Sequence, residues 1–208
     1  MVIAYHCVMS NTSRTENTRA LLLGAARREF AAHGIAGARV DRIAESAGVN
    51  KQRIYAHFGD KEQLFRHVVG EAVGELSQAA TLTDDSDPAA YVGRIFDYHR
   101  SHPDVLRLLL WEALHYGDSP VPDEEGRAAL YDAKVASLSG AVGGTDSDTH
   151  VRHLLLTMIG LAAWPQITPQ LTRLVLGRGP SDEQTQDQLR AYLMDFAGNA
   201  IPAPSSRS

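Results

Sequence analysis

The side chains with the most distinctive chemistry lie in one short stretch, Val40–Phe58. Ile54 and Phe58 are four residues apart and would hold a short helix against a core. Burial of that face leaves five residues pointing outward, namely Lys51, Gln52, Arg53, Ala56 and His57. Lysine and arginine neutralise phosphates, and arginine and glutamine pair with guanine and adenine edges in the major groove. The pattern therefore predicts a surface that contacts duplex DNA.

Two short helices must position these side chains. Residues 40–47 and 50–58 are expected as helices that are separated by a turn containing Gly48, which is the helix-turn-helix pattern. The apolar inside of the first helix and the turn consists of Ile43, Ala44, Ala47 and Val49. An ordinary pair of core helices with a solvated basic face remains an alternative, because such pairs also occur in bundles that bind no nucleic acid.

The rest of the sequence is also expected to be helical. Apolar residues recur at helical spacing, and Gly, Pro and Asp separate stretches of helical length. Further helices are expected at about 15–33, 61–80, 88–102, 103–116, 123–143, 151–165, 168–175 and 181–200. The predicted fold class is all-α.

Charge divides the chain into a basic front and an acidic rear. Residues 10–66 carry ten Lys and Arg against six acids, whereas residues 67–208 carry ten against nineteen. This division suggests a polyanion-binding module on a body that does not bind polyanions. A front that binds protein instead of DNA is a further alternative, which the positive charge argues against.

Cysteine usage and hydropathy indicate a cytoplasmic protein. The single cysteine, Cys7, excludes an internal disulfide framework. No apolar run reaches the roughly 20 residues of a membrane span. The opening Met1–Met9 lacks the basic region and cleavage site of a signal peptide, so residues 1–14 are expected as a disordered leader. Met1 and Met9 both remain candidates for the native start.

At the residues of the helix-turn-helix the chain resembles the TetR family of bacterial transcription regulators. The matching segments are Ala25-Ala26…Phe30…Gly34, Ile43-Ala44…Ala47-Gly48-Val49, Ile54–Phe58 and Asp60–Phe65. These segments span four consecutive predicted helices, so the resemblance is specific. It implies a homodimeric, ligand-responsive repressor that binds a palindromic operator, is released by an unidentified small-molecule effector and associates with the nucleoid when bound to DNA.

The resemblance also implies a domain layout. Residues 15–60 would form a three-helix DNA-binding domain, and residues 61–201 a larger helical domain for effector binding and dimerisation. Residues 202–208, rich in Pro and Ser, are expected as a disordered tail.

Roles for single residues follow from the same resemblance. Tyr55, His57 and Lys61 stand where TetR-like proteins contact backbone phosphates. Base-reading positions are held by Lys51, Gln52 and Arg53. Arg39 stands where a threonine commonly caps the helix and touches a phosphate. Arginine can reach a phosphate but cannot cap, so a weak start is expected for the helix at residue 40.

The helix-turn-helix of one chain, its reading head, covers only one half of a palindromic operator, so a two-fold dimer is expected. The apolar stripes of 151–162 and 189–200 would form a four-helix bundle with a second copy, as in TetR-like proteins. The expected interface residues are Val151, Leu155, Met158, Leu189, Tyr192 and Phe196. Alternatively, both stripes face the core of their own chain.

The helix expected at 103–116 is apolar nearly all round yet includes polar groups, which is typical of the wall of a small-molecule pocket. Candidate lining residues are Phe96, His99, Trp111, His115, Met158 and Trp164. The alternative for each of them is an ordinary core position.

Metal and enzyme hypotheses find little support. Histidines lie three apart at His99/His102 and His150/His153, and Glu112 precedes His115 by three. The second Glu-x-x-His that a di-metal bundle needs is not found, and solvated helix caps explain both histidine pairs. An enzyme with Glu112 and His115 as acid and base would lack a nucleophile elbow, a P-loop and a dinucleotide fingerprint. No cofactor, metal or catalytic residue is therefore predicted.

Overall fold

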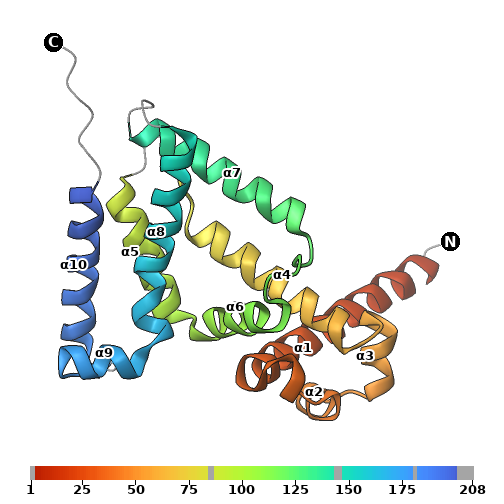
Figure 1. The fold of residues 1–208 in the computed structure, drawn as a ribbon. Helices are drawn as coiled ribbons and strands as arrows, with labels where there is room; N and C mark the ends of the chain where they lie inside the picture. The colour runs from red at the N-terminus through yellow and green to blue at the C-terminus, as the bar shows by residue number, and fades with distance from the viewer. Residues whose placement is uncertain (1–2, 84–86, 143–146, 180–181, 201–208) are drawn as a thin grey trace. The chain divides into compact units, whose positions relative to one another are not determined.

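The computed structural model describes residues 3–83, 87–142, 147–179 and 182–200. Within these ranges the chain forms ten α-helices and no strand, as the sequence predicts (Figure 1). The helices are α1 (Ile3–Gly37), α2 (Val40–Ala47), α3 (Lys51–Phe58), α4 (Lys61–Ala79), α5 (Pro88–Ser101), α6 (Pro103–Tyr116), α7 (Glu124–Ala141), α8 (Asp148–Ile167), α9 (Pro169–Leu176) and α10 (Glu183–Ala200). No helix in these ranges is both long and apolar enough to cross a membrane.

The helices form two compact units. The head unit comprises Met1–Val73 and Arg107–Ser119, and the body unit comprises Gly74–Leu106 and Pro120–Ser208. α4 and α6 each contribute to both units. The domain boundary expected at residue 60 therefore differs from the division in the structure, because α4 continues the head core. Phe65 of α4 is fully buried and meets the Phe30 ring edge-on, with centroids 5.1 Å apart.

α1 consists of two helices that meet at Gly34, whose φ of 63° and ψ of 177° are not helical. The stop that the sequence predicts at Gly34 is thus present as a kink. At its other end α1 begins at Ile3, so residues 3–14, expected as a disordered leader, are helical. No Gly or Pro occurs between Ile3 and Leu23 to interrupt that helix. The expected tail, 202–208, lies outside the described residues.

The body unit is built around α5, α8 and α10, which run side by side, with α7 also against α8 (Figure 1). Its core contains the fully buried Tyr91, Phe96, Leu138 and Met158. α8 continues two residues past Pro165, where the sequence predicts its end. The Thr172 hydroxyl of α9 donates to the Pro165 carbonyl at 3.0 Å, which ties the two helices at this corner.

Candidate nucleic-acid interface

α2, the turn and α3 have the helix-turn-helix geometry. Gly48 caps α2 in the left-handed region, with φ 66° and ψ 31°. The Asn50 side chain caps α3 by accepting a hydrogen bond from the Gln52 amide at 2.9 Å. Ile54 and Phe58 are buried, at 0% and 4% exposure, and fasten α3 to the head core. One face of α3 is therefore fixed and the other faces solvent.

The outward face of α3 carries five of the predicted DNA-contacting residues, whereas Arg39 precedes α2 and Lys61 begins α4. Lys51, Gln52, Arg53 and Tyr55 are exposed, and His57 is partly exposed. Around the C-terminal end of α3, the Arg19 guanidinium lies 5.7 Å from the centre of the Phe58 ring, and the His67 ring lies 5.4 Å from it. Side chains from α1 and α4 thus help to hold α3 in place.

The start of α2 is capped from α1. Arg39 makes no side-chain cap, as predicted. Glu29 supplies the missing acceptor, because its carboxylate accepts a hydrogen bond from the Arg39 amide at 2.8 Å and another from Arg42 Nε at 2.8 Å. Burial alone would raise the pKa of Glu29, but the hydrogen bonds from Arg42 and from the Arg39 backbone hold it below its usual value. The weak helix start expected from the sequence is therefore compensated by a residue ten positions away.

Two of the predicted cationic contacts have partners within the head unit. Lys51 Nζ forms an ion pair with Asp41 Oδ1 of α2 at 2.8 Å. Lys61 Nζ donates to the Ala38 carbonyl at 3.3 Å, from the first turn of α4. Each ammonium group thus has a partner in the head unit, although the Lys51 side chain remains exposed.

Two predicted effector residues, Trp111 and His115, belong to the head unit. The Trp111 indole N–H donates to the Ala31 carbonyl at 3.3 Å, and the Arg107 guanidinium donates to the same oxygen at 2.8 Å. The indole also packs on Gly34, where a Cβ would stand only 2.7 Å from its ring. The exposed His115 ring lies 6.4 Å from that of Phe65. These contacts give both side chains a packing role on α1 and α4.

The other predicted effector residues lie in the body unit. Phe96, His99 and Met158 are buried, with at most 2% exposure, whereas Trp164 is 55% exposed on α8. The described surface has a hollow of about 500 Å³ beside α9 and α10 and another of about 330 Å³ in the head unit. None of the six predicted effector residues lines either hollow. In the described ranges, no three His, Cys, Asp or Glu side chains are grouped to hold a metal ion.

His99 is an ionisable side chain that is almost completely buried. Its side chain is only 2% exposed, and within the described residues its Nδ1 has no hydrogen-bond partner. Burial lowers the pKa of His99 to about 4, so the imidazole is neutral at pH 7.

Acidification is expected to destabilise the protein through His99. The unfolded chain binds a proton at His99 near pH 6.5, whereas the folded chain resists it down to about pH 4. The folded state is therefore penalised progressively as pH falls from 6.5 towards 4, by roughly 2 kcal/mol between pH 7 and 5. Urea unfolding of the protein and of His99→Leu at both pH values measures this loss. Equal losses in the two proteins would contradict the assignment to His99.

Three of the six predicted interface residues are buried inside their own chain instead of being exposed to a partner. Val151, Leu155 and Met158 are at most 4% exposed, because they fill the core of their own body unit. The exposed row of α8 is Leu156, Gly160 and Trp164 instead. On α10, Leu189 is partly buried, whereas Tyr192 and Phe196 are 65% and 51% exposed, with ring centroids 6.5 Å apart.

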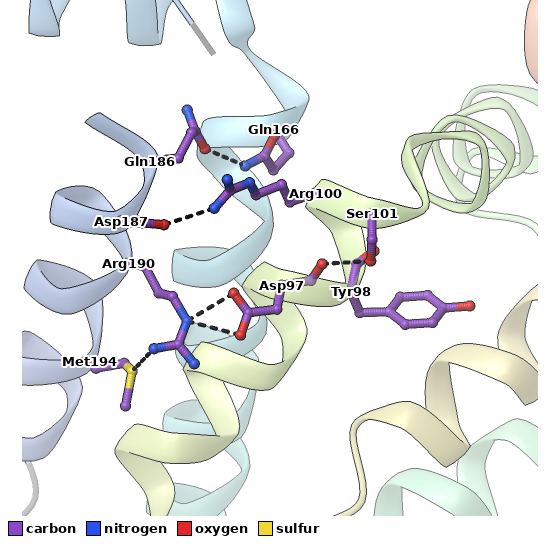
Figure 2. A network of polar contacts seen from close by, with 9 residues as sticks. All are labelled: Asp97, Tyr98, Arg100, Ser101, Gln166, Gln186, Asp187, Arg190 and Met194. Atoms are coloured by element: carbon purple, nitrogen blue, oxygen red, sulfur yellow. Dashed lines mark hydrogen bonds and ion pairs between the residues drawn. The ribbon is translucent and has the colours of Figure 1, made fainter. Parts of the chain in front are cut away.

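A polar network fixes how α10 lies on α5 (Figure 2). Arg190 Nε donates to both carboxylate oxygens of Asp97, at 2.8 and 2.9 Å, and Arg100 pairs with Asp187 at 3.0 Å. A Cβ at Gly93 would stand 2.8 Å from Met194 Sδ, so glycine permits the close approach of the two helices. Because Arg190 turns toward α5, residues two and six positions later, Tyr192 and Phe196, turn away from it.

Comparisons with known families agree with both units. A family model described as "Bacterial regulatory proteins, tetR family" matches residues 22–68. A second, "Tetracyclin repressor-like, C-terminal domain", matches residues 87–198.

Individual relatives extend the match along the chain. The HTH-type transcriptional repressor SCO4008 of Streptomyces coelicolor is 40% identical over 166 residues, 79% of this chain and 86% of that protein. The HTH-type transcriptional repressor NicS of Pseudomonas putida is 26% identical over 195 residues, covering 88% of this chain and 92% of NicS. Among solved structures, the transcriptional regulator SCO4942 of Streptomyces coelicolor aligns with a TM-score of 0.74 and 30% identity, over 90% of this chain and 99% of that one. The chain therefore belongs to the TetR family of bacterial helix-turn-helix transcriptional regulators, and it is a DNA-binding regulator rather than an enzyme.

Proposed function

We propose that the protein is a homodimeric repressor that inserts α3 into the major groove of a palindromic operator and is released by a small-molecule effector. The observation that carries this proposal is the fixed and exposed state of α3. Ile54 and Phe58 hold it to the core while Gln52, Arg53 and Tyr55 face solvent. SCO4008 and NicS, which cover most of the chain, are both named as repressors.

Within this proposal the residues of α3 divide into two groups. Lys51, Gln52 and Arg53, in the first turn, read base edges, since arginine and glutamine can each make two hydrogen bonds to one base. The residues proposed to contact phosphates are Arg39, Tyr55, His57 and Lys61. Phosphate contacts set the position and the affinity, whereas base contacts set the sequence preference.

Dimerisation is proposed through the outer faces of α8 and α10. Leu156 and Trp164 lie eight residues apart on one side of α8, with Gly160 between them. A Cβ at Gly160 would meet nothing within 4 Å, so the helix surface there is open to close approach. Groups of exposed apolar side chains, especially those that include tryptophan, mark protein contact sites. A second copy is the proposed occupant, because each chain carries one reading head and a palindrome needs two.

The effector is proposed to bind among the apolar side chains of the body unit near Phe96, His99 and Met158. The support is Nδ1 of His99, which has no hydrogen-bond partner among the residues that the structure describes. A buried polar atom without a partner is costly, and a ligand hydrogen bond would offset that cost. The proposed pocket omits Trp111 and His115, which belong to the head unit, and Trp164, which is exposed on α8. A thermal-shift screen of small apolar acids, amides and alcohols tests this, with His99→Leu as the variant that should lose the response.

The DNA-binding proposal is tested by selecting bound fragments from the source genome and measuring their affinity against salt. Arg53→Ala is expected to weaken operator binding about 5- to 150-fold and to relax the preference at one base position, as loss of one bidentate contact does.

Lys61→Ala is expected to weaken binding to all sequences alike and to lower the salt slope by about one.

Two outcomes would contradict these assignments. Unchanged base preference in Arg53→Ala would remove Arg53 from the reading positions. Binding of a protein partner, with no salt-dependent binding of DNA, would contradict the proposed use of α3.

A further inference from the structure

The ion pair between Asp41 and Lys51 joins α2 to α3 at the surface proposed to contact DNA. Lys51 Nζ and Asp41 Oδ1 are 2.8 Å apart, and their side chains are 44% and 60% exposed. Exposed pairs of this kind contribute little to folding, because solvent screens them. Stability alone is therefore a weak reason for a carboxylate at this position.

The carboxylate of Asp41 acts on more than one cation. The hydrogen bond and the charge of Lys51 lower the pKa of Asp41, and the nearby charge of Arg39 lowers it further. Asp41 thus stays ionised at neutral pH, beside two of the side chains proposed to contact DNA. A negative charge there opposes approach to phosphates and cancels much of the attraction that Lys51 offers.

This cancellation affects the two kinds of DNA binding unequally. Binding to arbitrary sequence rests almost wholly on neutralised phosphates and released counterions. Binding to an operator adds hydrogen bonds to bases, which Gln52 and Arg53 can make regardless of the pair. Lys51 keeps two of its three N–H donors when it is paired with Asp41, so the pair still allows it to hydrogen-bond to a base edge.

We propose that Asp41 is a specificity-determining residue: it holds Lys51 on α2 and so keeps it from serving as an additional phosphate contact on non-operator DNA. The inference rests on the proposed placement of α3 in the groove. Its effect is to lower the affinity for arbitrary sequence and thereby to raise the ratio of operator to non-operator binding.

The test compares Asp41→Asn with a matched control, Glu45→Gln. Glu45 is an exposed acid on the same helix, and its side chain makes no hydrogen bond or ion pair within the described residues. Both changes remove one negative charge from α2, but only Asp41→Asn releases Lys51. Affinities are measured on a random-sequence duplex between 0.05 and 0.3 M salt, with a melting curve for each variant.

One further phosphate contact corresponds to a gain of roughly eightfold at 0.1 M salt and to a slope steeper by about 0.9. Asp41→Asn is expected to show this gain on the random duplex and a smaller gain on the selected operator. Glu45→Gln is expected to change the random-duplex affinity by about twofold or less, since its charge is screened. In a Lys51→Ala background, Asp41→Asn should fall to the level of the control.

Equal gains in Asp41→Asn and Glu45→Gln would overturn the inference, because net charge would then explain both. So would a gain that persists without Lys51. An unmodified protein that binds neither duplex in a salt-dependent way would contradict the proposed role of α3 and this inference with it, whereas normal operator binding with no effect of Asp41→Asn would contradict this inference alone.

Discussion

Replacing Gly34 with alanine is expected to destabilise the head unit by roughly 2–5 kcal/mol. Gly34 has φ 63° and ψ 177°, a region that is open almost only to glycine. A Cβ there would stand 2.7 Å from two ring atoms of Trp111. Alanine must therefore change the backbone and displace the indole at the same time. Urea unfolding followed by circular dichroism measures the loss.

Gly48→Ala is the matched control for this experiment. Gly48 also has a positive φ, 66°, but a Cβ there would meet nothing within 4 Å. Only the left-handed backbone is then penalised, by roughly 1–2 kcal/mol. A Gly34→Ala protein that is no less stable than Gly48→Ala would contradict the close packing of Trp111 on α1.

The fold was largely predictable because its boundaries are set by neighbours in sequence. α2 ends at Gly48, α3 starts at the Asn50 cap, and α6 starts at Pro103, as expected from local chemistry. The long helix α1 was less predictable at its first residue, where no cap or breaker marks a start. The all-α class followed from helical periodicity along most of the chain.

Contacts between distant parts of the chain were not predictable. Nothing near Arg39 in sequence reveals that Glu29 accepts the hydrogen bond from its amide. The sequence predicts a pocket position for Trp111, but an aromatic residue on an apolar helix fits many surroundings. Only the fold shows that a glycine at position 34 leaves the space that the indole fills.

α8 shows that an apolar stripe in the sequence predicts which side of a helix is buried, but not which part of the protein buries it. The regular stripe that includes Val151, Leu155 and Met158 packs into the core of its own body unit. The proposed contact with a second copy uses the less regular apolar residues beside that stripe, Leu156 and Trp164. On α10 the polar contacts to α5 decide the rotation of the helix, which a single-helix pattern does not contain (Figure 2).

Replacing Phe196 with glutamate is expected to convert the proposed homodimer into monomers and to lower operator affinity by about 10²- to 10⁴-fold. Phe196 is 51% exposed and stacked beside Tyr192, so in the single chain the charge faces solvent and the fold is retained. In a dimer the same charge would be buried without a partner. Analytical ultracentrifugation gives the oligomeric state, and binding to full and half operators gives the loss.

A charge placed on another exposed apolar residue separates the interface from a general effect of surface charge. Leu130 of α7 is 43% exposed and lies outside the proposed face, so Leu130→Glu should leave both the dimer and operator binding unchanged. With one head per monomer, Phe196→Glu should bind full and half operators equally, because the second head no longer acts at high effective concentration. A Phe196→Glu protein that stays dimeric with full operator affinity would move the interface away from α10.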